Sequence, residues 1–262
     1  MTGPGAAGEF TGSGEFAGLG AIVTGGASGI GLATARLLAR RGATVACLDL
    51  RPEDVPEPLI GLRADIADDA EVRAAVALAA ERLPGIHVLV NNAGIGAEGT
   101  IEDNPDDEWA RVIDVNVLGM VRVSRAVLPH LRAAGGGAIV NLGSIAAHTG
   151  LPQRALYSAS KGAVQALTLA MAADHVRDGI RVTCINPGTV DTPWVRRLLD
   201  LADDPAAELT ALRVRQPTGR LVSVEEVAAA VAYLASPAAA ATTGTVLAVD
   251  GGAHGLRVRD PR

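Results

Sequence analysis

The stretch that decides the fold is Thr24-Gly-Gly-Ala-Ser-Gly-Ile-Gly31, a glycine-rich turn that joins an apolar run at 19–24 to a helical pattern at 30–41. The run before the turn has the length and composition of a buried strand, and Gly42 ends the helix after it. Glycines let the backbone turn tightly and approach a ligand closely, while the N–H groups and positive dipole end of the helix suit a pyrophosphate. The turn therefore favours a phosphate site, although a plain structural turn can have the same spacing.

Short apolar runs and helical patterns alternate along the rest of the chain. Further strands are predicted at residues 43–48, 59–64, 87–91, 138–142, 180–185 and 245–249. Helices are predicted at residues 68–83, 105–131, 157–176, 195–212 and 224–234. Such alternation produces right-handed crossovers and a parallel sheet covered on both faces, with ligands at the carboxyl ends of the strands. We therefore expect a single-domain α/β Rossmann fold over residues 15–262, a doubly wound seven-stranded parallel sheet, after a flexible tail at 1–14.

Composition and charge exclude several classes of function. The 262 residues are 48% hydrophobic and 20% charged, which is ordinary for a globular domain, and the formal charge is −6. This balance argues against nucleic acid or an anionic membrane as a partner. Two cysteines, Cys47 and Cys184, are too few for a disulfide framework, and no apolar run reaches the ~20 residues of a membrane helix. With no export signal at the N-terminus, we expect a cytoplasmic protein with buried, reduced thiols.

A single lysine stands out against 22 arginines. Lys161 follows Tyr157 by four residues on a predicted helix, so the two side chains lie on one face. A planar guanidinium does not replace a compact ammonium in a tight site, and a cation beside a phenol favours the phenolate. The phenol can then exchange a proton with a substrate hydroxyl near neutral pH. Ser144, just after the strand at 138–142, could hydrogen-bond the substrate oxygen.

Five motifs in the same order resemble the short-chain dehydrogenase/reductase family, and the resemblance spans nearly the whole chain. The motifs are Thr24–Gly31, Asn91-Asn-Ala-Gly94, Ser144, Tyr157-Ser-Ala-Ser-Lys161 and Pro187-Gly188. The resemblance implies that Tyr157 is the general acid/base and that Lys161 binds the nicotinamide ribose and tunes Tyr157. It also implies that Ser144 positions the substrate carbonyl and that Asn116 holds a water in a proton relay.

The expected cofactor is NAD. Asp49 ends the second strand, where an acidic side chain can accept hydrogen bonds from the adenosine ribose and would repel a 2′-phosphate. Arg51 is a nearby basic residue, and a basic side chain at this position would instead favour NADP. The predicted cofactor contacts, most of them implied by the resemblance, are Gly25, Ser28, Gly29, Ile30, Gly31, Asp49, Leu50, Asp65, Ile66, Asn92, Ala93, Gly94, Tyr157, Lys161, Pro187, Gly188, Val190 and Thr192.

The substrate is expected beneath a lid at about residues 189–221. Arginine forks bind carboxylates bidentately, and Arg154 and Arg215 are placed near the predicted cleft. The predicted substrate contacts are Ser144, Arg154, Tyr157 and Arg215. A dehydrogenase of a small hydroxy acid or sugar acid, interconverting a secondary alcohol and a ketone, is therefore the favoured function.

This lid also resembles a narrower group within the family, the cytosolic type 2 3-hydroxybutyrate dehydrogenases and the 2-keto-3-deoxy-L-fuconate dehydrogenases. The shared pieces are Arg154, Pro187-Gly-Thr-Val-Asp-Thr-Pro193 and Arg215-Gln-Pro-Thr-Gly-Arg220. In that group the arginines that match Arg154 and Arg215 face the substrate carboxylate. The chain departs from the group at Trp194, where serine is common.

Other functions stay open at this point. The lid arginines could be merely solvated in a neutral sugar, polyol or steroid alcohol dehydrogenase, and a 3-oxoacyl reductase is a further alternative. A non-catalytic dinucleotide-binding regulator is disfavoured by the intact set of Ser144, Tyr157 and Lys161. The five histidines show no metal-ligand spacing, although His148 lies near Ser144 and could touch a substrate. The family resemblance also implies a homotetramer, assembled through the helices at 157–176 and 224–234 and the last strand.

Overall fold

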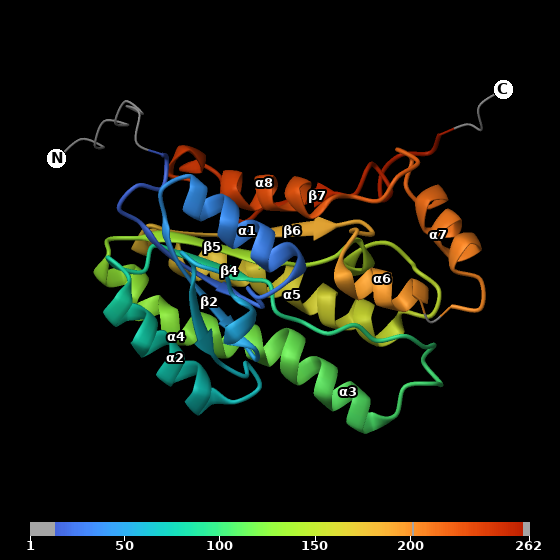
Figure 1. Ribbon diagram of the computed structural model, residues 1–262, viewed down its shortest axis with the longest axis horizontal. Coiled ribbons are helices and arrows are strands. Elements are labelled where there is room, and N and C mark those ends of the chain that lie inside the picture. Colours follow the sequence, from blue (N-terminus) through green and yellow to red (C-terminus); the bar gives the residue numbers. More distant parts are fainter. Residues whose placement is uncertain (1–13, 201, 259–262) are drawn as a thin grey trace.

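The computed structural model describes residues 14–200 and 202–258, and one twisted sheet runs through its centre (Figure 1). Over these ranges the sheet has seven strands, all parallel, in the order β3-β2-β1-β4-β5-β6-β7. The bounds are β1 (Gly20–Thr24), β2 (Thr44–Asp49), β3 (Ile60–Arg63), β4 (Val88–Asn91), β5 (Gly137–Leu142), β6 (Ile180–Pro187) and β7 (Val246–Val249). The predicted doubly wound seven-stranded sheet is confirmed.

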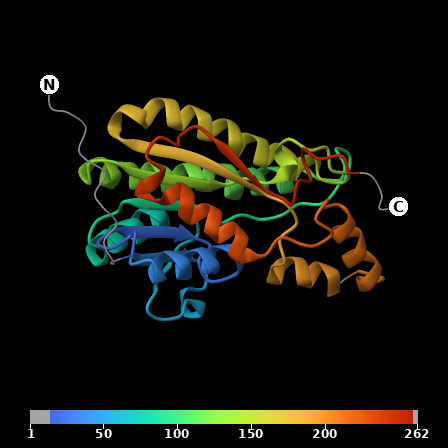
Figure 2. The same cartoon turned by 90° about the horizontal axis from the view of Figure 1, so that it is seen from above.

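Helices cover both faces of the sheet (Figure 2). They are α1 (Gly29–Arg40), α2 (Asp69–Arg82), α3 (Asp106–Ile113), α4 (Met120–Ala133), α5 (Ala155–His175), α6 (Pro193–Asp200), α7 (Pro205–Val214) and α8 (Val224–Ala235). Helices α1 and α8 pack together on one face, while α2, α4 and α5 lie on the other. Alternate residues of β4 serve the two cores, since Val90 belongs to the α1/α8 cluster and Leu89 to the opposite one. This two-sided burial explains why the strands are continuous apolar runs.

The strand order reverses at β1, which places the expected ligand crevice. Ala21 of β1 pairs with Val45 of β2 on one side and with Val88 of β4 on the other. In sheets of this kind, ligands bind outside the carboxyl ends of the strands at such a switch point. The loops that leave β1 and β4 therefore border the crevice.

The predicted helix at 195–212 is two helices, α6 and α7, separated by bends at 202–204. Asp204 caps α7 by accepting hydrogen bonds from the N–H groups of Ala206 and Ala207, and Pro205 follows it. An aspartate cap with proline at the first helical position starts a new helix, so the pattern could not continue through it. Both helices extend past the carboxyl ends of the strands, at the right of Figure 1.

Both cysteines are buried and form no disulfide, as expected. Burial raises the pKa of the Cys47 thiol to about 12, with a smaller contribution from the charge of Asp49. Burial likewise raises the pKa of the Cys184 thiol to about 11. Neither thiol is a reactive thiolate near neutral pH, because the thiolate is the nucleophilic form.

The predicted division into a tail at 1–14 and a domain at 15–262 stays a prediction. Residues 1–13 lie outside the described part of the chain, so only Gly14 of that tail is placed. Across the described residues, none of the helices is long and apolar enough to span a bilayer.

Candidate active site

The glycine-rich turn is built so that its backbone faces the crevice. Gly25 has φ +64° and donates its N–H to the Leu48 carbonyl at 2.8 Å, which fixes the turn to β2. A Cβ on Gly31 would lie 2.1 Å from the Gly25 carbonyl oxygen, so only glycine permits this close approach. Ser28 begins α1 without a capping hydrogen bond from its side chain. The N–H groups of the first helical turn are therefore available to a phosphate.

A hydrogen-bonded clamp joins this turn to the loop after β4. Thr24 Oγ1 accepts hydrogen bonds from the N–H groups of Asn92 and Ala93, both at 3.0 Å. The Asn92 amide donates back to the carbonyls of Thr24 at 2.9 Å and Gly25 at 3.2 Å. Four hydrogen bonds thus join the two loops at the switch point, and the Thr24 hydroxyl is a positioning group that the sequence analysis did not single out.

Asp49 lies beside the glycine-rich turn at the end of β2. Its Oδ2 accepts a hydrogen bond from the Ala27 N–H at 3.0 Å, and its Oδ1 accepts one from the Arg51 N–H at 3.1 Å. The Arg51 guanidinium turns to Asp54, with an N–O distance of 3.3 Å. The carboxylate therefore borders the turn while the nearest cation is engaged elsewhere. Leu50, the next predicted contact, is exposed.

The loop after β3, where Asp65 and Ile66 are predicted to contact the cofactor, exposes less side-chain surface to the crevice than expected. Asp65 accepts a hydrogen bond from the Ala67 N–H at 2.9 Å. The Ile66 side chain is buried, and a Cβ on Gly119 would lie only 2.7 Å from Ile66 Cδ1. Ile66 thus packs into the core against the chain between α3 and α4.

Asn116 lies on a π-helical turn, Asp114–Gly119, which interrupts the predicted helix at 105–131. Its Oδ1 accepts the Ile95 N–H at 2.8 Å, and its Nδ2 donates to the Ile95 carbonyl at 2.9 Å and to Ser160 Oγ at 3.1 Å. Ser160 Oγ in turn donates to the Tyr157 carbonyl at 2.8 Å. The asparagine therefore ties the loop after β4 to the first turns of α5. Such π-turns are frequent at functional sites.

Tyr157 and Lys161 lie on one face of α5, as their spacing predicts. The Lys161 side chain is buried, and its Nζ donates to the Leu142 carbonyl at 2.9 Å and lies 5.7 Å from the Tyr157 ring centroid. A Cβ on Gly94 would be 3.6 Å from Lys161 Nζ and 3.0 Å from Asn116 Oδ1. The ammonium and the Asn116 amide thus both lie at the loop after β4, and the Tyr157 ring lies beside the ammonium.

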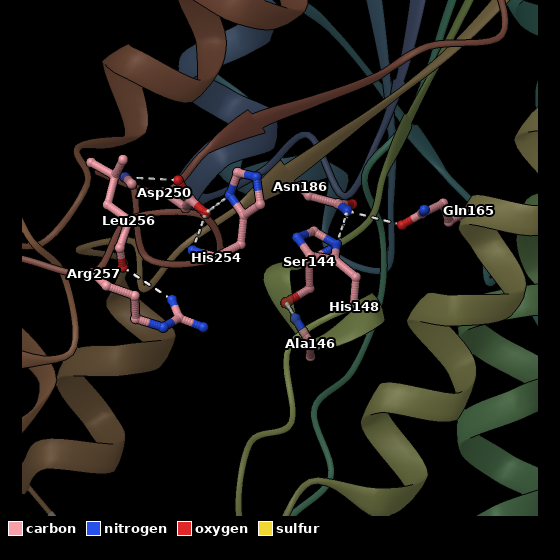
Figure 3. A network of polar contacts seen from close by, with 10 residues as sticks. Ser144, Ala146, His148, Gln165, Asn186, Asp250, His254, Leu256 and Arg257 are labelled. Atoms are coloured by element: carbon pink, nitrogen blue, oxygen red, sulfur yellow. Dashed lines mark hydrogen bonds and ion pairs between the residues drawn. The ribbon is translucent and has the colours of Figure 1, made fainter.

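Ser144 follows β5 and is held by Asn186, the fully buried asparagine near the end of β6 (Figure 3). The Ser144 N–H donates to Asn186 Oδ1 at 3.1 Å, and Ser144 Oγ accepts a hydrogen bond from the Ala146 N–H at 3.2 Å. A Cβ on Gly143 would lie 2.1 Å from Asn186 Oδ1, so the loop passes directly over this amide. Asn186, which precedes the Pro187-Gly188 motif, was not among the predicted site residues.

The segment after β6 crosses toward the glycine-rich turn. Gly188 donates its N–H to the Val249 carbonyl at 3.0 Å, and Val190 is buried and bridges to Val222. The nearest atom to a Cβ placed on Gly29 is Thr192 Cγ2, at 3.8 Å. Thr192 therefore lies close to the start of α1, at the glycine-rich turn.

Of the two predicted carboxylate-binding arginines, one is ion-paired and the other is exposed without a partner among the described residues. Arg154 pairs with Glu98 at 3.2 Å and donates to the Gln153 carbonyl at 3.0 Å. Arg215 follows α7, is exposed, and makes no side-chain hydrogen bond or ion pair within residues 14–200 and 202–258. Trp194, where the chain departs from the narrower group, lies against Gly96, since a Cβ there would be 2.5 Å from Trp194 Cζ2. No grouping of histidine, cysteine and carboxylate side chains suited to a metal ion occurs in the described part of the chain.

Comparison with known proteins agrees with this architecture. A family model described as enoyl-(acyl carrier protein) reductase matches residues 25–254. A cis-4-hydroxycyclohexanecarboxylate dehydrogenase of Sinomonas cyclohexanicum is 42% identical over 242 residues, covering 88% of this chain and 95% of that protein. Dehydrogenase/reductase SDR family member 6 of Rattus norvegicus is 39% identical over 234 residues, with coverage of 88% and 95%.

A solved structure gives the same result. Ligand-free aldohexose dehydrogenase of Thermoplasma acidophilum superposes with a TM-score of 0.89 at 32% identity, covering 96% of this chain and 100% of that one. The chain belongs to the short-chain dehydrogenase/reductase family, whose dehydrogenases use a nicotinamide dinucleotide.

Proposed function

We propose that this protein is an NAD-dependent oxidoreductase that interconverts a secondary alcohol and a ketone on a small hydroxy acid or sugar acid. The observation that carries the proposal is the buried Lys161 ammonium, 5.7 Å from the Tyr157 ring centroid and adjacent to the loop after β4. Among the described residues its one hydrogen-bond partner is the Leu142 carbonyl, and a buried charge with so little compensation is costly for stability. A non-catalytic dinucleotide-binding regulator has no need of this cation beside a phenol.

The residues around β1 and β4 fit a nicotinamide dinucleotide. The glycine-rich turn and the first turn of α1 would hold the pyrophosphate through backbone N–H groups, and Asp49 would accept hydrogen bonds from the adenosine ribose. Lys161 would donate to the nicotinamide ribose, beside Gly94. Bound cofactor supplies the acceptor or donor of hydride. NAD is preferred over NADP because the Asp49 carboxylate would repel a 2′-phosphate and Arg51 is paired with Asp54.

Proton transfer is the part of the reaction that the chain's own residues perform. During oxidation Tyr157 takes the proton of the substrate hydroxyl, and during reduction it returns that proton to the carbonyl oxygen. The Lys161 ammonium, held by the Leu142 carbonyl, places a positive charge 5.7 Å from the centroid of the Tyr157 ring. Ser144 donates a hydrogen bond to the same substrate oxygen. The loop that carries Ser144 is held by the hydrogen bond from the Ser144 N–H to Asn186.

Asn116 contributes mainly by position. Both hydrogens of its amide nitrogen are engaged by Ile95 and Ser160, and one lone pair of Oδ1 accepts from the Ile95 N–H. A relay water held by this side chain would bind the second lone pair of Oδ1. The role implied by the family is therefore retained in the proposal, with the acceptor atom specified.

The acidic substrate class rests on the arginines and on one relative. Arg215 is exposed and makes no described ion pair, so its guanidinium is available to a carboxylate, and a relative that is 42% identical is named for a hydroxycyclohexanecarboxylate. A neutral sugar is the second candidate, because Arg154 is already paired with Glu98 and a similar solved structure is an aldohexose dehydrogenase. The proposal also includes a homotetramer assembled through α5, α8 and β7. Three apolar or aromatic side chains are about half exposed there: Leu169 on α5, Val176 just after it, and Tyr233 on α8.

Initial rates with a matched panel test this function. The panel is cis-4-hydroxycyclohexanecarboxylate, cyclohexanol and glucose, each with NAD and with NADP, followed by nicotinamide absorbance. We expect the acid with NAD to have the highest kcat/KM, and Arg154→Ala or Arg215→Ala to raise KM for the acid about tenfold or more, as for a lost charged hydrogen bond. Arg73→Ala on α2, whose partner is Asp69, is the control and leaves KM unchanged. Equal KM values in all three variants would show that the lid arginines do not bind a carboxylate.

A further inference from the structure

Two exposed imidazoles lie beside Ser144, and each is anchored by a buried side chain (Figure 3). His148 is on the loop after β5, and His254 follows β7, more than a hundred residues later. Their ring centroids are 5.0 Å apart with the planes at 87°. Neither histidine has a role in the proton transfer described above.

The hydrogen bonds of Asn186 fix the tautomer of His148. The Ser144 N–H can only donate, so the Asn186 atom that faces it at 3.1 Å is the carbonyl oxygen Oδ1. The Asn186 amide nitrogen is then the donor to Gln165 Oε1 and to His148 Nδ1, both at 3.0 Å. His148 Nδ1 is therefore an acceptor and carries no proton. The imidazole is neutral and presents Nε2–H, a hydrogen-bond donor.

A buried carboxylate holds a proton on Nδ1 of His254, whereas Nδ1 of His148 has none. Asp250 is 4% exposed, and its Oδ2 lies 2.6 Å from the ring atom Nδ1 of His254. The same oxygen accepts a hydrogen bond from the backbone N–H of His254 at 3.0 Å. Although burial raises the pKa of Asp250, the hydrogen bonds from His254 and from the Gly252 N–H outweigh it and hold that pKa below its usual value. The ionised carboxylate only accepts, so Nδ1 of His254 carries the proton and Nε2 is the other polar atom of the ring.

Both Nε2 atoms are thus left for a ligand. Neither has a hydrogen-bond partner among the residues that the structure describes, and both side chains reach solvent. His148 offers an N–H donor, and His254 offers the second ring nitrogen of an imidazole whose Nδ1 is held by Asp250, both next to the loop that presents Ser144. This arrangement suits an oxygen-bearing group, because hydroxyl and carboxylate oxygens both accept from an N–H donor, and a hydroxyl can also donate to an unprotonated ring nitrogen.

We propose that His148 and His254 form the subsite for the second oxygen-bearing group of a bifunctional substrate, the group that is not oxidised. The inference rests on the proposed function, in which Ser144 and Tyr157 hold the reacting oxygen. His148 and His254 are specificity-determining residues in this account. They select a hydroxyl or carboxylate at a distance from the carbinol, whereas an alcohol without such a group gains nothing from them.

Asparagine and glutamine variants separate contact from anchoring. His148→Asn and His254→Asn keep a polar atom near Nδ1 for Asn186 or Asp250 but remove Nε2. His148→Gln keeps an N–H donor near the position of Nε2. The three substrates are cis-4-hydroxycyclohexanecarboxylate, 1,4-cyclohexanediol and cyclohexanol, and thermal unfolding of each variant reports any structural damage.

We expect each asparagine variant to raise KM for both bifunctional substrates about tenfold, the effect of one lost hydrogen bond of about 1.4 kcal/mol, with kcat and the KM for cyclohexanol within twofold of the parent. His148→Gln should recover part of the loss. If only the acid or only the diol responds, that result identifies the group that occupies the subsite. Equal KM changes for all three substrates would overturn the subsite while leaving the proposed function intact. Unchanged oxidation of all three by Tyr157→Phe would instead overturn the proposed function.

A spectroscopic measurement tests the anchoring without turnover. Histidine 15N–1H correlation spectra, assigned with the same variants, should show the Nε2–H tautomer for His148 and a protonated Nδ1 for His254. Adding the acid to the NADH-bound protein should shift both signals and leave His130 on α4 unmoved. An Nδ1–H tautomer at His148, or signals that stay fixed at saturating acid, would overturn the inference.

Discussion

Replacing Asn116 with aspartate changes one polar group of a side chain that joins three parts of the site. The retained oxygen can still accept the Ile95 N–H at 2.8 Å. The variant loses the two hydrogen bonds that Nδ2 donates, to the Ile95 carbonyl at 2.9 Å and to Ser160 Oγ at 3.1 Å. It also places a second oxygen against the Ile95 carbonyl in a site that is 3% exposed.

The expected loss of stability follows from these two bonds. At about 1 kcal/mol net for each, with a further penalty for the uncompensated carbonyl, Asn116→Asp should lower the free energy of unfolding by about 2–3 kcal/mol. Urea unfolding at a fixed protein concentration measures this difference. Because the same bonds position the loop after β4 and the first turns of α5, we expect kcat to fall at least tenfold under conditions where the variant is folded.

Thr168→Val on the same helix is the matched control. Thr168 Oγ1 accepts a hydrogen bond from buried Asn141 at 2.9 Å, so its loss should cost about 1–3 kcal/mol, three helical turns beyond Tyr157. We expect kcat to stay within twofold of the parent in this variant. A loss below about 0.5 kcal/mol for Asn116→Asp, or equal kcat values in the two variants, would refute the positioning role.

Two further predictions address the ammonium and the cap of α8. Lys161→Met and Lys161→Arg should each lower kcat/KM by about 10²–10⁴, because neither side chain supplies a compact cation beside Tyr157. Initial rates measure this change, and a loss below tenfold would contradict the prediction. Glu226 accepts hydrogen bonds from Arg220 and from the Ser223 N–H, which hold its pKa at about 2 against the ordinary 4.5. Since the folded-state pKa is the lower one, this stabilisation is complete above about pH 4.5 and is lost as the pH falls toward about 2. Glu226→Gln should therefore be less stable than the parent by about 1 kcal/mol near neutral pH. That difference should vanish as the pH falls from about 4.5 to about 2. A difference in unfolding free energy that stays constant with pH would show that the carboxylate is not responsible.

The fold was readable because its signals are local. The glycine-rich turn, the continuous apolar strands and the α5 spacing of Tyr157 and Lys161 depend on neighbours in the chain, and all are found in the structure. The break before α7 also had a local signal, Asp204 followed by Pro205, which a count of helical residues overlooks.

The rest of the site depends on contacts between distant segments. Within the π-helical turn, Asn116 bonds to Ile95 and Gly119 packs against Ile66. Neither contact follows from the helical pattern around the turn. The tautomer of His148 depends on Asn186 of β6. The ring that lies against His148 belongs to His254, which follows β7. The ion pair of Arg154 with Glu98 likewise joins segments that the sequence does not bring together.

The most direct test of the account is the turnover of Tyr157→Phe, with NAD binding measured in parallel on the same preparation. The account predicts that NAD binds with nearly the parent affinity while oxidation of every panel alcohol falls by about 10²–10⁴, because the phenol hydroxyl that carries the proton is gone and the ring remains. A folded, NAD-binding variant that oxidises these alcohols as fast as the parent would contradict the assignment of Tyr157 as the general acid/base.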